Sequence, residues 1–292
     1  MNAFLERLNS GDILVADGAT GTNLQKVGLI GGMHTEDWVF DHPDKILELE
    51  KAFVAAGSDI ILTCTFGGTY PRMKGAKHSD KVEQVNKRAV ELAREAASMR
   101  KGVLVGGSIG PIGQLLKPYG PITHGEAVEA FAQQAKSLAE GGVDLIVLET
   151  HFALEEVNAA FEGARSVTDL PIVVSFGYDR ATRTMMGVKP ADVMKKYRAL
   201  GAALIGANCG TTLENMEAIM REYGAAEPGF PLWAKPNAGM PRLEGTETIY
   251  DVTPEEMGEY ARKYVSLGAR VVGGCCGSTP EHVAAISKAV KK

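Results

Sequence analysis

Three of the four cysteines in this 292-residue chain lie in glycine-rich segments, residues 206–210 (GANCG) and 273–277 (GGCCG). Thiolates are soft ligands that favour Zn²⁺ over Mg²⁺ or Ca²⁺. Three protein ligands and an open fourth position are typical of a catalytic zinc site, whereas a structural site is closed by four. The flanking glycines let the backbone turn and let an ion approach. The pattern therefore predicts a metal centre formed by Cys209, Cys275 and Cys276.

The chemistry predicted for such a centre is the activation of a thiol. Three thiolates give the ion a negatively charged ligand shell, so it activates water poorly, but it can accept an external thiol as its fourth ligand. The ion then holds that thiol as a thiolate, below the usual thiol pKa of about 8.5. A thiolate is the nucleophile at neutral pH. Two other interpretations remain: a redox switch through a disulfide between Cys275 and Cys276, and a buried cysteine acting as a small hydrophobe, which we expect for Cys64.

Eight short apolar runs, several of them preceded by a glycine, indicate buried parallel strands. Amphipathic stretches lie between these runs and indicate helices. The alternation of eight strands with helices predicts a (β/α)8 TIM barrel, with residues 1–292 forming a single domain. An open doubly wound sheet is the alternative, but residues 18–21 (GATG) lack the G-x-G-x-x-G spacing of a dinucleotide loop. The expected strands are residues 13–16, 60–63, 103–107, 145–149, 172–176, 204–208, 232–235 and 271–275, and the expected helices are residues 44–56, 82–99, 126–140, 154–167, 190–200, 213–223, 254–267 and 280–290.

The carboxyl ends of barrel strands meet at one rim, where barrel enzymes carry their active sites. The sixth and eighth strands are two positions apart, roughly 10 Å before side chains reach inward, so the three thiols can converge. Asp17 follows the first strand and Glu149 ends the fourth, which places both carboxylates at the same rim. The amides of residues 18–21 can receive a small anion.

Composition excludes several other classes of protein. The chain has 31 Lys and Arg against 36 Asp and Glu, a formal net charge of −5, so a basic excess for nucleic-acid binding is missing. No window approaches about 18 consecutive apolar residues, which argues against a membrane span. The first residues, MNAFLER, do not resemble a secretory signal, so we expect a cytoplasmic protein with free thiols.

The chain resembles the homocysteine S-methyltransferase family, which includes the zinc barrel of cobalamin-dependent methionine synthase and betaine–homocysteine methyltransferase. The resemblance extends from the first strand to the eighth. It implies transfer of a methyl group to the thiol of L-homocysteine, giving L-methionine, with Zn²⁺ on Cys209, Cys275 and Cys276. The motifs that carry the resemblance are residues 17–22 (DGATGT), 63–67 (TCTFG), 149–150 (ET), 206–210 (GANCG), 235–239 (KPNAG) and 273–277 (GGCCG).

The resemblance also implies residues that bind homocysteine. Asp17 and Glu149 would accept from the ammonium group, and contacts from Gly18 and the Thr65 hydroxyl are expected beside them. In the methionine synthase branch the Asn of the KPNAG motif, here Asn237, fills the fourth zinc position when substrate is absent. In the betaine branch a Tyr after the strand-four Glu does so, and this chain has a Thr there.

The methyl donor stays open between several classes. A methylated corrinoid (methylcobalamin) on a separate protein is one, and S-methylmethionine, dimethylsulfoniopropionate and betaine are the small onium donors. Aromatic side chains often enclose an onium cation, and residues 66–70 (FGGTY) provide few, which favours the corrinoid. Methyl transfer to another thiol or selenol, and a non-catalytic zinc-binding barrel, are the alternative functions.

Overall fold

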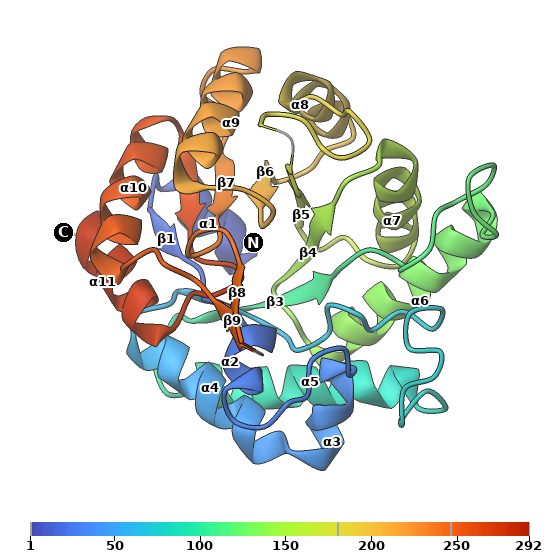
Figure 1. Cartoon of the computed structure of the whole chain (residues 1–292). Coiled ribbons are helices and arrows are strands. Elements are labelled where there is room, and N and C mark those ends of the chain that lie inside the picture. The colour runs from blue at the N-terminus through green and yellow to red at the C-terminus, as the bar shows by residue number, and fades with distance from the viewer. Residues whose placement is uncertain (1, 180, 246, 292) are drawn as a thin grey trace.

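The computed structural model describes residues 2–179, 181–245 and 247–291, and its centre is a barrel of eight parallel strands (Figure 1). Each strand is short and buried, as the apolar runs require. The order of hydrogen-bonded neighbours is β1-β10-β7-β6-β5-β4-β3-β2. The strands are β1 Leu14–Val15, β2 Ile60–Leu62, β3 Leu104–Ile109, β4 Leu145–His151, β5 Ile172–Phe176, β6 Leu204–Asn208, β7 Leu232–Lys235 and β10 Ala269–Val272.

The barrel closes between its first two strands through only a few contacts. Ala16 forms a parallel bridge with Ile60. The Asp17 amide donates to the Ile60 carbonyl at 3.0 Å. Because β1 is only two residues long and pairs with β10 on its other side, this bridge completes the ring. The predicted (β/α)8 barrel is confirmed.

Helices surround the barrel on the outside, and a helix follows each strand before the next begins (Figure 1). Several begin with proline in the first turn, and α10 also has a capping box between Thr253 and Glu256. None of the described helices is long and apolar enough to cross a membrane. The outer helices are α4 Pro43–Ala55, α5 Val82–Ala97, α6 His124–Gly141, α7 Leu154–Val167, α8 Pro190–Ala199, α9 Leu213–Ala226, α10 Pro254–Ser266 and α11 Pro280–Val290, and the loop after β1 carries α2 Gly21–Gln25, η1 Thr35–Asp37 and α3 Trp38–Asp41.

Side chains fill the lower part of the barrel. One buried cluster contains strand residues such as Leu145 and Trp233, together with Phe4 of the N-terminal helix α1 (Ala3–Asn9). This helix therefore closes the amino end of the barrel, and open space is left at the carboxyl end. Neither α1 nor the hairpin of β8 (Arg242–Glu244) and β9 (Glu247–Ile249) was among the expected elements.

The last strand ends earlier than the sequence suggested. β10 stops at Val272, whereas residues 271–275 were the expected strand. Beyond Val272 the backbone leaves the sheet: the Gly274 amide donates to the Asp17 carbonyl at 3.0 Å, and the Cys275 amide to the Pro236 carbonyl at 2.7 Å. Cys275 and Cys276 therefore lie on a loop that is tied to the ends of β1 and β7.

Gly206 lies where the backbones of β6 and β7 approach closely, and a larger residue would not fit there. A Cβ on Gly206 would lie 1.8 Å from the carbonyl oxygen of Trp233, its partner in the sheet. Backbone cannot move away without breaking the sheet, so we expect Gly206→Ala to lose at least about 3 kcal/mol of unfolding free energy or to prevent folding. Urea unfolding followed by circular dichroism measures this.

The matched control is Gly125→Ala. Gly125 is exposed in the first turn of α6, and a Cβ there would meet nothing within 4 Å. We expect this variant to be neutral or more stable by up to roughly 1 kcal/mol, because alanine favours the helix. Equal losses in the two variants would contradict the packing argument.

Candidate metal centre

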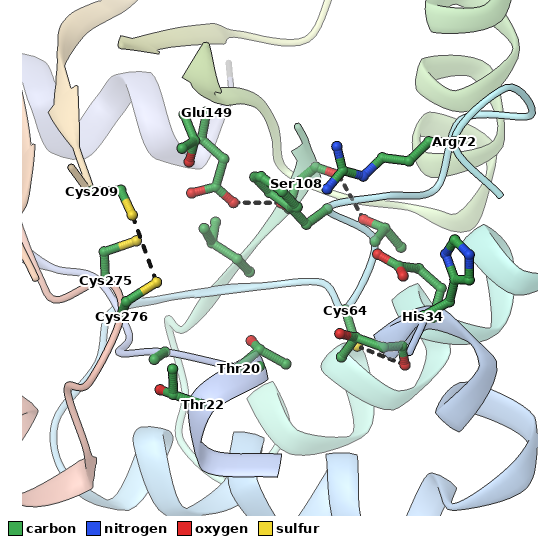
Figure 2. Close-up of a pocket in the computed structure, with 18 of the residues that line it drawn as sticks. Thr20, Thr22, His34, Cys64, Arg72, Ser108, Glu149, Cys209, Cys275 and Cys276 are labelled. Atoms are coloured by element: carbon green, nitrogen blue, oxygen red, sulfur yellow. Dashed lines mark hydrogen bonds between the residues drawn. The ribbon is translucent and has the colours of Figure 1, made fainter. Parts of the chain in front are cut away.

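A cavity of about 890 Å³ opens at the carboxyl end of the barrel, above the side chains that fill its interior (Figure 2). The carboxyl ends of β2, β3, β4 and β7 and the segments that follow β1, β2, β3, β6 and β10 contribute to its wall. Its volume lies at the upper end of the range for small-molecule sites. Among the residues that line it are Asp17, Gly18, Thr65, Glu149, Cys209, Cys275 and Cys276, all of them expected at the site from the sequence.

The three expected metal ligands come together on one side of this cavity. The Sγ atoms of Cys209, Cys275 and Cys276 lie within 4.8 Å of one another. The sulfurs of Cys209 and Cys276 are 3.6 Å apart. Two sulfurs at the usual Zn–S length in a tetrahedron are separated by roughly 3.8 Å. The donor set and its spacing therefore fit zinc, with one coordination position left for another ligand.

An unusual backbone conformation presents two of the side chains at this rim. Cys209 has φ 59° and Thr150 has φ 61°, in the left-handed region that side chains other than Asn, Asp or Gly seldom adopt. Asn208 supports Thr150 and Cys275, because its Oδ1 accepts from the Thr150 amide at 2.9 Å and its Nδ2 lies 3.6 Å from the Cys275 sulfur. Residues held in such conformations cluster at functional sites.

Without a cation the three thiols resist ionisation. For Cys209 the hydrogen bond with Cys275 lowers the pKa, but the contact with Cys276 and burial outweigh it and raise the pKa to about 12. The pKa of Cys276 is also raised to about 12: the bond with Cys209 lowers it, and the neighbouring Cys275 thiol with burial raises it further. Like charges at this separation oppose one another. A divalent cation is the group that would let all three become thiolates.

Asn237 follows β7 and is not among the residues that line the cavity. Its side chain is buried, and Oδ1 has no hydrogen-bond partner among the residues that the structure describes. The next residue, Ala238, donates from its amide to the Cys276 carbonyl at 2.9 Å. A buried amide oxygen without a hydrogen-bond partner lowers the stability of the fold, so this oxygen is suited to bind a ligand. Its assignment to the fourth metal position stays a prediction.

Two buried carboxylates share one lysine at the base of the cavity. Lys235 Nζ lies 2.5 Å from Asp17 Oδ1, and the other Asp17 oxygen accepts from the Leu62 amide at 2.7 Å. Glu149 accepts from the Ser108 hydroxyl at 2.5 Å. Burial raises the pKa of both carboxyls, while the charge of Lys235 opposes this rise. With Lys235 charged and both carboxyls ionised, the three groups would carry a net charge of −1, which a substrate ammonium would neutralise.

Gly18 and Thr65 both contribute to the structure of the cavity wall. A Cβ on Gly18 would lie 2.7 Å from the Phe53 ring, so the position requires glycine. The Thr65 hydroxyl donates to the Ser108 carbonyl at 2.7 Å and lies 2.6 Å from the Thr63 hydroxyl. The role of Thr65 in substrate binding therefore stays a prediction, with its proton already committed to the backbone.

Several residues of the site were not assigned a role from the sequence. Lys235 belongs to the KPNAG motif, and its position at the end of a barrel strand is the signal that it faces the rim. Ser108 lies one residue before the end of β3 and Asn208 ends β6, and they position Glu149 and Thr150. Arg72 lies in the loop after β2 and carried no signal beyond its charge.

A parallel barrel with three convergent thiols at its carboxyl end defines the class: a (β/α)8 protein with a candidate thiolate metal centre. The sequence profile of the homocysteine S-methyltransferase family matches residues 14–290. The chain belongs to this family, and it is an enzyme of the methyltransferase type.

Known proteins resemble the chain in sequence and in fold. A methionine synthase of Mycobacterium leprae (strain TN) is 27% identical over 298 residues, which cover 96% of this chain and 24% of that protein. The chain thus spans about a quarter of the length of this curated relative. The metallated homocysteine methyltransferase MmuM from Escherichia coli has a TM-score of 0.83 at 23% identity, covering 98% of this chain and 99% of that one. A methyltransferase from Methanosarcina mazei has a TM-score of 0.62 at 14% identity, covering 98% and 96%. Both of these solved structures have the same barrel fold as this chain.

Proposed function

We propose that this protein transfers a methyl group to the thiol of L-homocysteine, giving L-methionine, with Zn²⁺ held by Cys209, Cys275 and Cys276. The observation that carries the proposal is the convergence of three thiols beside a buried carboxylate pair in one cavity. Homocysteine matches this arrangement, because it has a thiol at one end and an ammonium group at the other. Membership of the homocysteine S-methyltransferase family supports it.

Different residues of the cavity would bind the ammonium and the carboxylate of homocysteine. Glu149 would accept from the ammonium group, and Asp17 would add negative charge beside it. The carboxylate would be received by amides of residues 18–21, apart from Ala19, whose amide already donates to the Ser278 carbonyl at 3.2 Å. Homocysteine would then lie with its sulfur toward the three cysteines.

The reaction is a nucleophilic substitution at the methyl carbon. When bound, zinc supplies the positive charge that lets the homocysteine thiol lose its proton near neutral pH. The substrate sulfur then forms a bond to the methyl carbon, and the bond from that carbon to the donor breaks with its electron pair going to the donor. The residues that bind ammonium and carboxylate fix the direction in which the sulfur points, and such positioning lowers the barrier.

The donor proposed first is a methylcorrinoid carried by a protein, with small onium compounds as the alternative. Most of the large apolar side chains that are exposed lie in loops at the mouth of the barrel, where a bulky partner would contact them. A contiguous apolar surface formed by such side chains would suit contact with a partner protein. These side chains are Val27, Ile30, Met33, Tyr70, Leu115, Tyr119, Met185, Met186, Met240 and Leu243.

Methionine formation tests the proposal directly. Zinc-loaded protein is incubated with L-homocysteine and methylcobalamin, S-methylmethionine, dimethylsulfoniopropionate or betaine, and methionine is quantified by mass spectrometry. We expect turnover with at least one donor and its loss after removal of zinc by a chelator, with recovery on re-addition. Turnover of coenzyme M or selenocysteine in place of homocysteine would favour the alternative acceptors. No product with any donor would contradict the proposed function.

A further inference from the structure

We infer that Arg72 is the donor-specificity residue of this cavity, and that it binds an anionic group of the methyl donor, a carboxylate or a phosphodiester. Arg72 belongs to the loop between β2 and α5, and it lines the main cavity. Figure 2 shows it on the side away from the three cysteines. This inference rests on the proposed function, because it names the part of the donor that the same cavity would hold.

The guanidinium of Arg72 has unused hydrogen-bonding capacity. Arginine has five N–H donors, and the side chain of Arg72 makes one described hydrogen bond, from Nη1 to the Pro111 carbonyl at 3.0 Å. No carboxylate among the described residues lies within ion-pair distance of it. By contrast, the other buried cation of the cavity, Lys235, is paired with Asp17 at 2.5 Å. Arg72 is therefore a half-buried cation that makes no ion pair with the described residues, although the Glu36 carboxylate lies nearby.

The local structure holds this guanidinium in place. Its Cζ lies 5.1 Å from the centre of the Phe66 ring, in a cation–π contact. Both residues fit against glycines: a Cβ on Gly67 would lie 3.0 Å from the Arg72 Nε, and one on Gly110 would lie 2.5 Å from the Phe66 ring. A planar guanidinium fixed in this way is suited to bidentate binding of a carboxylate or phosphate.

The surroundings make this wall a place for a donor and not for homocysteine. A second cavity of about 390 Å³ shares Phe66 and Arg72 with the main one and is lined further by Leu115 and Phe152. The nearby Glu36 accepts from the Gly67 amide at 2.5 Å, so that this carboxylate is committed to the backbone. The face of Phe66 that could receive an onium cation is already covered by Arg72. The wall therefore offers apolar surface, the Arg72 guanidinium and the carboxylates of Glu36 and Glu156, of which Glu156 accepts from the Ile112 amide at 2.7 Å. The remaining N–H donors of Arg72 suit an anionic group on a larger or extended donor.

Two matched pairs of donors test the inference in zinc-loaded protein with saturating homocysteine. Dimethylsulfoniopropionate has a carboxylate that trimethylsulfonium lacks, and methylcobalamin has a phosphodiester that methylcobinamide lacks. We expect the wild-type protein to prefer the anionic member of the pair that it uses. Arg72→Gln should raise the KM for that anionic donor about 10- to 100-fold, the worth of a charge-assisted hydrogen bond, with a much smaller change for its anion-free partner. The pair that responds identifies the source of the anion.

Controls separate this inference from a general defect. Arg72→Lys keeps the charge without the planar fork and should fall between wild type and Arg72→Gln. Arg88→Gln removes an exposed arginine of α5 that pairs with Glu91 at 2.8 Å, and it should behave as wild type. The KM for homocysteine should stay within about twofold in Arg72→Gln, because additive behaviour is expected for separate sites. Equal changes for both members of a pair, or none, would overturn the inference while the proposed function stands. Inactivity of the wild-type protein with all four of these donors would overturn the inference, and inactivity with S-methylmethionine and betaine as well would overturn the proposed function.

Discussion

Replacing Cys209 with serine is expected to remove both the bound metal and the methyl transfer. Wild-type protein should contain about one zinc per chain, and Cys209→Ser well below half of that, since one of three protein ligands becomes a hard, weakly binding hydroxyl. Methionine formation should fall by at least ~10³-fold, because a free thiol is only a few per cent ionised at pH 7 and is no longer oriented. Metal analysis together with the methionine assay measures both effects.

Cys64 provides the matched control. It is the one cysteine outside the cluster, it is buried, and its sulfur lies 3.7 Å from the Thr35 carbonyl. Burial raises the pKa of its thiol well above the usual value, so it stays protonated. We expect Cys64→Ala to retain zinc and most of the activity. Full zinc content in Cys209→Ser, or equal losses in the two variants, would exclude the proposed centre.

The sequence predicted the strands, which recur in every βα unit of the barrel. The apolar runs became strands whose ends all lie within three residues of the expected ones, because burial on both faces leaves few other conformations for them. Once eight strands form a ring, their carboxyl ends converge, and Cys209, Asp17 and Glu149 must meet whatever the loops do. Their shared location could therefore be inferred without any knowledge of side-chain contacts.

The parts that escaped prediction depend on distant packing. Lys235 meets Asp17 from strands that have β10 between them, and the contact depends on the register of both strands. The stack of Arg72 on Phe66 depends on the path of the loop after β2, for which no periodicity exists. Helix α1 lies before the first strand. Asn2 caps it by accepting from the Phe4 and Leu5 amides, and its packing depends on the end of the barrel that Phe4 covers.

Replacing Lys235 with methionine is expected to cause a large loss of stability. The change would leave Asp17 and Glu149 buried without their cation, and removing one partner of a buried ion pair costs about 3–5 kcal/mol. Urea unfolding of zinc-free protein measures the loss without a contribution from the metal. The control Lys51→Met breaks an exposed pair with Glu95 and should cost no more than about 1 kcal/mol.

Neutralising the partner should restore much of the stability. In the double variant Asp17→Asn, Lys235→Met no unpaired charge is left at Asp17, so we expect it to be more stable than Lys235→Met alone. The loss in Lys235→Met should also shrink as the pH falls. Burial raises the pKa of Asp17, and without Lys235 nothing comparable opposes that rise. A carboxyl whose pKa is higher in the folded than in the unfolded chain binds its proton more tightly when folded, so stability increases as the pH falls through the folded pKa. A loss that is independent of pH and unchanged in the double variant would mean that Lys235 acts through packing of its aliphatic chain and not through its charge.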